Sequence, residues 1–127
     1  MENKHPTFGN GKICYIEIPA DDIHASSTFY HKTFGWNIRY DGEGEKSFDD
    51  GVGEVSGRWV KDRAPITEGG ILVHIMVDDV EEAIKLVEAN GGEIVQPLTN
   101  DHNEITARFS DPGGNIFGLY QHNTLVK

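Results

Sequence analysis

The sequence contains a single cysteine, Cys14, among its 127 residues. One cysteine cannot form an internal disulfide, and this composition is typical of proteins from a reducing compartment. No apolar run approaches the roughly 20 residues needed to cross a bilayer, and residues 1–5 do not have the pattern of a secretory signal. We therefore expect a cytoplasmic protein that folds without a disulfide.

Basic residues are few as well. The chain has 11 Lys and Arg against 21 Asp and Glu, so its formal net charge is −10. Nucleic acid and anionic membrane surfaces would repel such a chain, and neither is expected as a partner. Small molecules and other proteins remain as expected partners.

The first half of the chain predicts a strand, a helix and three further strands. A β-rich run ends at Pro19, and Asp21 and Asp22 after it are good N-cap residues for a helix that ends at Gly35. Cys14 is expected to face this helix as a buried, inert thiol. The strands are expected at 12–18, 36–40, 46–49 and 52–61, with a polar turn at 41–45.

The second half, after a linker at 63–70, repeats this order. Asp79 and Glu82 form a capping-box pattern at the start of a helix that ends near Asn90. The strands are expected at 71–77, 93–96, 104–110 and 115–121. Asp22 matches Asp79 at a spacing of 57 residues, and Gly57 matches Gly118 at a spacing of 61. This internal repeat predicts one α+β domain, 1–127, built from two βαβββ modules at about 10–62 and 69–122.

Segments of both halves resemble one known family. Tyr15–Asp22 and Phe34–Trp36 resemble the first module of the glyoxalase/bleomycin-resistance/dioxygenase proteins, the vicinal oxygen chelate superfamily, and Asp111–Leu119 resembles the end of the second module. The resemblance implies a curved mixed-sheet cup formed by two βαβββ modules, within one chain or across a homodimer. A homodimer is expected here.

Enzymes of this superfamily usually hold a divalent metal in the cup with His and Glu side chains from four equivalent strand positions. In this sequence the resemblance and the repeat place those positions at Tyr15, Gly57, Leu72 and Gly118. Leu and Gly have no side-chain ligand, and Tyr is an uncommon one. No two of the six histidines are two, three or four residues apart, so no local histidine chelate exists. We predict no metal or other cofactor at these positions, and a divalent metal held by other residues is left open.

Glu17 and His74 are the polar candidates for the cup. Each lies two residues after a cup position, Tyr15 or Leu72, and residues i and i+2 of a strand share a face. Glu17 could hold the His74 imidazole in one tautomer, so that His74 acts as a general base. The alternative is that the two side chains satisfy each other or face solvent at the rim.

Aromatic side chains give a second candidate site. Trp59 and Tyr120 lie two residues beyond Gly57 and Gly118, so all four are expected to line one surface. Flat rings above small residues make a slot for a planar or cationic ligand. The alternative for Trp59 is core packing or a dimer interface.

Three functions follow from these observations. The first is a metal-free cup that binds a small organic molecule through Tyr15, Gly57, Trp59, Leu72, Gly118 and Tyr120. The second is a metal-free lyase or isomerase that uses His74 and Glu17. The third, against which the ligand positions argue, is a metal-dependent enzyme of the lactoylglutathione lyase or dioxygenase type.

Overall fold

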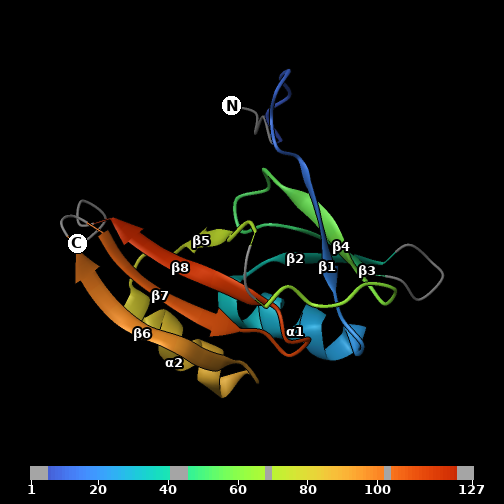
Figure 1. Ribbon diagram of the computed structural model, residues 1–127. Helices are drawn as coiled ribbons and strands as arrows, with labels where there is room; N and C mark the ends of the chain where they lie inside the picture. The colour runs from blue at the N-terminus through green and yellow to red at the C-terminus, as the bar shows by residue number, and fades with distance from the viewer. Residues whose placement is uncertain (1–5, 41–45, 68–69, 102–103, 123–127) are drawn as a thin grey trace.

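The computed structural model describes residues 6–40, 46–67, 70–101 and 104–122, and the turn expected at 41–45 lies outside this part. The elements follow the predicted order, strand–helix–three strands, twice (Figure 1). They are β1 (Tyr15–Pro19), α1 (Ile23–Phe34), β2 (Asn37–Tyr40), β3 (Lys46–Asp49), β4 (Ser56–Val60), β5 (His74–Met76), α2 (Val80–Ala89), β6 (Glu93–Asp101), β7 (Glu104–Ser110) and β8 (Ile116–His122). The predicted α+β fold of two βαβββ modules is confirmed.

Each module forms one four-stranded mixed sheet. The strand orders are β1-β4-β3-β2 and β5-β8-β7-β6, which are the same order in the two modules. In both sheets the first strand is parallel to its neighbour, and the other strand pairs are antiparallel. Both helices lie on the same side of the sheets (Figure 1), and neither is long and apolar enough to span a membrane.

The helices begin at the aspartates that the sequence indicates. The carboxylate of Asp22 accepts a hydrogen bond from the backbone N–H of Ala25 at 3.0 Å, and that of Asp79 accepts one from Glu82 at 3.3 Å. These bonds satisfy N–H groups that have no partner within the helix. Gly35 ends α1 with a φ of 73°, a left-handed conformation that glycine adopts without steric cost.

An aromatic cluster on α1 joins the two modules. The ring of Tyr30 stacks on Trp36 of the first module with centroids 4.5 Å apart, and it meets the edge of Phe117 in the second module at 5.9 Å. Phe29, beside it, lies 5.7 Å from Phe109 of β7. All of these rings are buried. The core is therefore continuous between the modules.

Several local predictions are wrong, and β4 and β5 are shorter than the expected 52–61 and 71–77. Strand β1 begins at Tyr15 instead of residue 12, and Cys14 is exposed, because the chain before Tyr15 leaves the sheet and extends away from the body (Figure 1). Strand β6 continues to Asp101 instead of ending near residue 96. It tolerates Pro97 because it is the outermost strand and its register with β7 shifts on both sides of Gln96.

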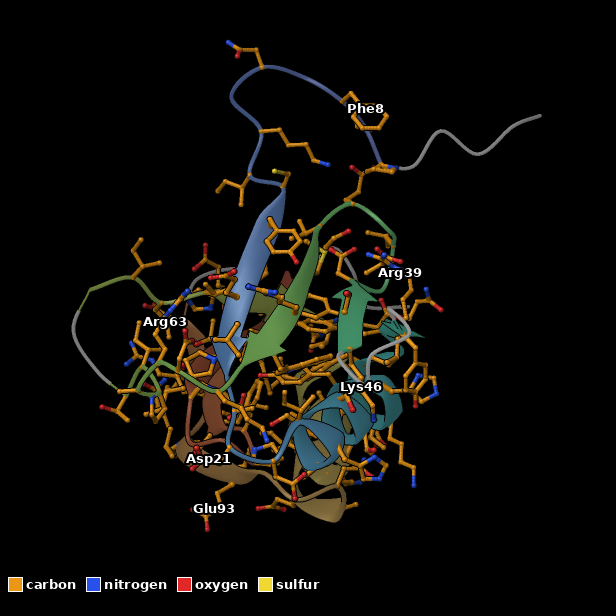
Figure 2. All side chains as sticks on the ribbon, turned by 90° about the vertical axis from the view of Figure 1, so that its right-hand side faces the viewer. Phe8, Asp21, Arg39, Lys46, Arg63 and Glu93 are labelled. Carbon is orange, nitrogen blue, oxygen red and sulfur yellow. The ribbon has the colours of Figure 1, made fainter. Side chains whose placement is uncertain are left out.

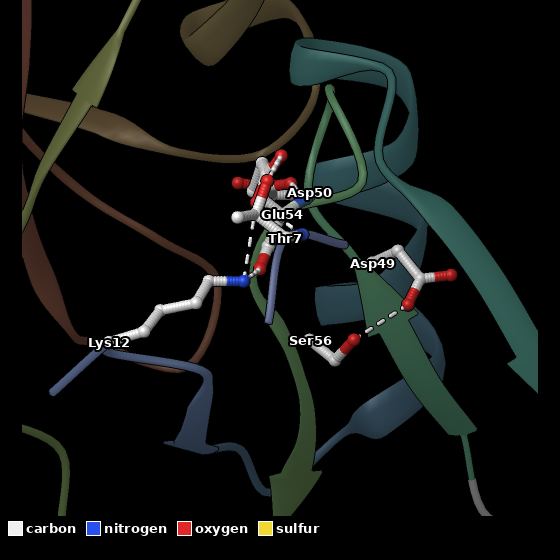
Figure 3. A network of polar contacts seen from close by, with 6 residues as sticks. All are labelled: Thr7, Lys12, Asp49, Asp50, Glu54 and Ser56. Carbon is white, nitrogen blue, oxygen red and sulfur yellow. Dashed lines mark hydrogen bonds and ion pairs between the residues drawn. The ribbon is translucent and has the colours of Figure 1, made fainter. Parts of the chain in front are cut away.

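The extended N-terminal segment is held by the acidic turn between β3 and β4 (Figure 3). The Glu54 carboxylate accepts hydrogen bonds from the backbone N–H and the hydroxyl of Thr7, both at 3.0 Å. It also forms an ion pair with Lys12 at 3.2 Å. Asp50 orders the turn itself by accepting the backbone N–H of Glu54 at 2.8 Å.

Candidate functional site

Each sheet has one face packed against the helices and a second face that we call its open face. In the first sheet the buried Ile18 points toward the core, so Tyr15 and Glu17 lie on the open face. Arg58 pairs with Glu17 in register and lies on the same face. Figure 2 shows Arg63, from the linker after β4, beside this face. The open face of the first module is therefore strongly polar.

The Glu17 carboxylate is paired with two arginines. Its carboxylate forms an ion pair with Arg58 at 3.3 Å and accepts a hydrogen bond from Arg63. The hydrogen bond from Arg63, the charge of Arg63 and the charge of Arg58 together lower the pKa of Glu17, against a smaller opposite effect of burial. Glu17 is thus an ionised anchor for two guanidinium groups.

His74 lies on the open face of the second sheet. It pairs in register with Gly118, and a Cβ added to Gly118 would lie 2.3 Å from the His74 Nδ1, so the imidazole stands directly over this glycine. Tyr120 follows on the same face. Within the described part of the chain no hydrogen bond joins His74 to Glu17. The expected carboxylate–imidazole contact is not formed, and a catalytic role for either residue stays a prediction.

Gly57 and Trp59 do not lie on the open face, so the prediction that they line one surface with Gly118 and Tyr120 is wrong. Trp59 is 3% exposed and belongs to the hydrophobic core. A Cβ at Gly57 would lie 2.0 Å from the carbonyl oxygen of Ile16 and 2.4 Å from the ring of Phe48. Both residues therefore face the helices, and no slot is formed with Tyr120.

The predicted alignment of β4 with β8, the equivalent strand of the second module, is wrong by one residue. Gly118 pairs with His74 and Arg58 pairs with Glu17, so the counterpart of Gly118 in the first module is Arg58 and not Gly57. A shift of one residue along a strand moves a side chain to the opposite face of the sheet.

The positions at which the superfamily usually holds its metal are therefore Tyr15, Arg58, Leu72 and Gly118. A guanidinium is a permanent cation without an acceptor atom, and the side chains of Leu and Gly offer no ligand. These residues do not fit a divalent metal. Over residues 6–40, 46–67, 70–101 and 104–122 no group of three or more His, Cys, Asp or Glu side chains is placed to hold one.

A hollow of about 640 Å³ opens on the second sheet, under the linker that leads into β5. Arg108 of β7 reaches it from the open face, since its neighbours Ala107 and Phe109 are fully buried. Arg108 forms no hydrogen bond or ion pair with any residue that the structure describes. The alternation along β7 was the signal that could have identified this outward arginine. The apolar lining comes from Ile66, Ile71, Leu72, Val95, Pro97 and Ile116.

A buried polar network ties the modules together behind the open faces. The Asp111 carboxylate accepts the Tyr30 hydroxyl at 2.7 Å and the backbone N–H groups of Gly113 and Asn115 at 2.9 Å each. The Asn115 amide also donates to the carbonyl of Pro19 in the first module at 2.8 Å. Burial raises the pKa of Asp111 although these hydrogen bonds oppose it, and burial with the charge of Asp111 raises the pKa of Tyr30 well above its usual value. Tyr30 is therefore a permanent donor.

Comparisons with known proteins agree with this architecture. Residues 12–119 match the model of the Glyoxalase/Bleomycin resistance protein/Dioxygenase superfamily. A glyoxylase-like domain-containing protein from Didymella fabae is 31% identical over 98 residues, which are 66% of this chain and 71% of that protein. The chain therefore belongs to the glyoxalase/bleomycin resistance protein/dioxygenase superfamily.

Solved structures with the same fold cover nearly the whole chain. A glyoxalase/bleomycin resistance protein/dioxygenase family enzyme from Burkholderia phytofirmans PsJN is 21% identical with a TM-score of 0.71, over 85% of this chain and 96% of that one. The antibiotic binding protein TnmS3 from Streptomyces sp. CB03234 is 20% identical with a TM-score of 0.72, over 91% of this chain and 99% of that one. At these identities the similarity establishes the fold alone.

Proposed function

We propose that this protein is a metal-free binding protein for a small organic anion, which it holds in the hollow beside Arg108. The observation that carries the proposal is the Arg108 guanidinium, which has no hydrogen bond or ion pair with any described residue and lies at the margin of a hollow of about 640 Å³ with both apolar and polar walls. Ligand sites of this kind commonly measure roughly 300–1,000 Å³ and combine apolar walls with a few polar groups. A carboxylate or phosphate on Arg108, with an apolar body against Leu72 and Ile116, satisfies both parts of the site.

The distribution of charge supports an anionic ligand. The protein is acidic, yet Arg39, Arg58 and Arg108 lie on the open faces. Asp49 pairs with Arg39, and Glu17 pairs with Arg58 and Arg63, whereas no described residue pairs with Arg108. Guanidinium groups match carboxylates and phosphates in shape and charge. A cationic ligand in a slot formed by Trp59 is no longer supported, because Trp59 is buried. One structural neighbour is an antibiotic binding protein, which supports binding as a function that this fold can perform.

The first test is a titration of 15N-labelled protein with 2-naphthoate, followed by NMR. Saturable shifts are expected around Arg108 and Leu72. Arg108→Gln is expected to weaken binding about 10- to 100-fold, because a hydrogen bond to a charged group contributes roughly 1.5–3 kcal/mol. Lys32→Gln is the matched control, since it removes an exposed positive charge from α1 and should leave the affinity unchanged. Equal affinities of the wild type and Arg108→Gln would refute the site.

The second test concerns metal. Untagged protein incubated with Zn, Ni, Mn or Fe salts and then dialysed is expected to retain only trace metal in elemental analysis, because Arg58, Leu72 and Gly118 supply no ligand atoms. Near-stoichiometric metal would contradict the metal-free proposal and favour a metal-dependent enzyme.

We further propose that a second copy of the chain covers the open faces. Four large hydrophobic side chains on or beside these faces are about half exposed or more. They are Tyr15, Ile71, Met76 and Val95. A second copy of the chain over these faces would remove the exposed apolar side chains from water. Sedimentation equilibrium at micromolar concentration is expected to give the mass of a dimer, and a mass of 14.1 kDa would contradict this proposal.

A further inference from the structure

His74 and Arg108 belong to one row of residues that crosses the second sheet. His74 of β5 pairs with Gly118 of β8, and Gly118 pairs in turn with Arg108 of β7. Arg108 pairs with Gln96 of β6. Residues that pair in this way have their side chains on the same face of a sheet. We call these four residues the cross-strand row, and it lies on the open face.

The glycine in the middle of the cross-strand row lets the two basic side chains approach each other. A Cβ added to Gly118 would lie 2.3 Å from Nδ1 and 2.6 Å from Cε1 of His74, so the imidazole occupies the space of the missing side chain. The ring therefore leans over β8, toward Arg108. Neighbouring strands are about 4.8 Å apart, so a ligand group above β8 is within reach of both side chains.

Both basic side chains are accessible to a ligand. His74 and Arg108 are exposed, and neither forms a hydrogen bond or an ion pair with any residue that the structure describes. No Asp or Glu is among the described residues of the cross-strand row or of the lining of the hollow. The N–H groups of these two side chains are therefore available to an anion, with no carboxylate of the described site to compete for them.

The cross-strand row continues the apolar wall of the hollow. Leu72 and Ile116 line the hollow, and each precedes a member of the row, His74 or Gly118, by two residues. Arg108 and Gln96, at the other end of the row, line the hollow themselves. A ligand whose apolar body rests against Leu72 and Ile116 therefore places its acidic group above Gly118, between the imidazole and the guanidinium.

The number of donors at this place distinguishes two classes of anion. A guanidinium binds both oxygens of a carboxylate through two parallel N–H groups, which leaves no oxygen for a further donor. A phosphate ester is tetrahedral and has three terminal oxygens. With two of them on Arg108, the third oxygen is directed out of the plane of the guanidinium, where the His74 imidazole can donate to it.

We propose that the acidic group of the ligand is a tetrahedral oxyanion, as in an aryl phosphate monoester, and that Arg108 and His74 bind it together above Gly118. The inference rests on the proposed function, because it uses the same hollow and the same arginine, and it adds the class of the acidic group. In this role His74 donates a hydrogen bond to the ligand and needs no contact with Glu17.

The experiment compares 2-naphthyl phosphate with 2-naphthoate, which have the same ring, in NMR titrations of the wild type and His74→Phe. The substitution keeps a flat ring beside Gly118 and removes the N–H donors. It is expected to weaken 2-naphthyl phosphate about 10-fold, the worth of one hydrogen bond to a charged group, and to change the affinity for 2-naphthoate by less than about twofold. Gly118→Ala, whose methyl group displaces the imidazole, should cause the same selective loss.

The control variant is His31→Phe, the same replacement at an exposed position of α1, on the helix side of the sheets (Figure 1). It should leave both affinities unchanged. Equal changes of the two affinities in His74→Phe, or no change in either, would overturn the phosphate site, while a dependence of 2-naphthoate on Arg108 would still support the proposed function. The absence of saturable shifts with both probes in the wild type would overturn both proposals.

Discussion

Replacing Gly57 with alanine is expected to destabilise the protein by about 3 kcal/mol or more, because the added methyl group has no space. Its Cβ would lie 2.0 Å from the Ile16 carbonyl oxygen and 2.4 Å from the Phe48 ring. A carbonyl in the adjacent parallel strand cannot turn aside without loss of the β1–β4 pairing. Urea denaturation measures the effect as a lower midpoint, or as a failure to fold.

Two glycine variants serve as controls. Gly9→Ala places its methyl group in open space and is expected to change stability by less than about 0.5 kcal/mol. In Gly118→Ala the three atoms nearest to the added Cβ all belong to the side chain of His74, which lies at the surface and can rotate away, so its cost should be smaller than that of Gly57→Ala. Stability of Gly57→Ala equal to that of the wild type would contradict the packing of β4 against β1.

Gly57 and Gly118 also explain why the sequence predicted the fold better than the site. Gly57 and Gly118 match in the repeat but have different roles, since one admits a neighbouring carbonyl and the other admits the His74 ring. A sequence alignment that pairs the glycines therefore moves Arg58 from the open face to the core. The order of elements, the aspartate caps and the family resemblance do not depend on this one residue, and they were predicted correctly.

The polar contacts of the open faces depend on the path of the chain in three dimensions. Arg63 reaches Glu17 across 46 positions because the linker after β4 returns past β1. No local pattern around Glu17 indicates that contact, and the internal repeat with the alternation of the strands favoured His74 as its partner. Arg108, by contrast, is indicated by the alternation of β7, because it lies between Ala107 and Phe109, which are both buried.

The second large effect is expected from Asp111→Ala, which should cost about 3–5 kcal/mol, because each buried donor left without an acceptor costs about 1–3 kcal/mol. The substitution removes the Asp111 acceptor from four donors: the buried Tyr30 hydroxyl and Asn115 N–H, the part-buried Gly113 N–H, and the Asn115 amide, which keeps its bond to the carbonyl of Pro19. Tyr30→Phe removes only one of these bonds and should cost about 1 kcal/mol. Asp62→Ala, in the exposed linker, is the matched control and should have little effect on the urea midpoint.

The difference in unfolding free energy between the wild type and Asp111→Ala depends on pH, and this dependence tests the buried carboxyl directly. Burial raises the folded-state pKa of Asp111 above its ordinary value of 3.8, so the folded protein holds this proton more tightly than the unfolded chain. The corresponding stability is fully present below the unfolded pKa and is lost as the pH rises through the folded pKa. The difference in unfolding free energy between the wild type and Asp111→Ala is therefore expected to be larger near pH 4 than near pH 7. A difference that grows with rising pH would mean that hydrogen bonding outweighs burial at this carboxyl, and that the network between the modules stabilises its charge.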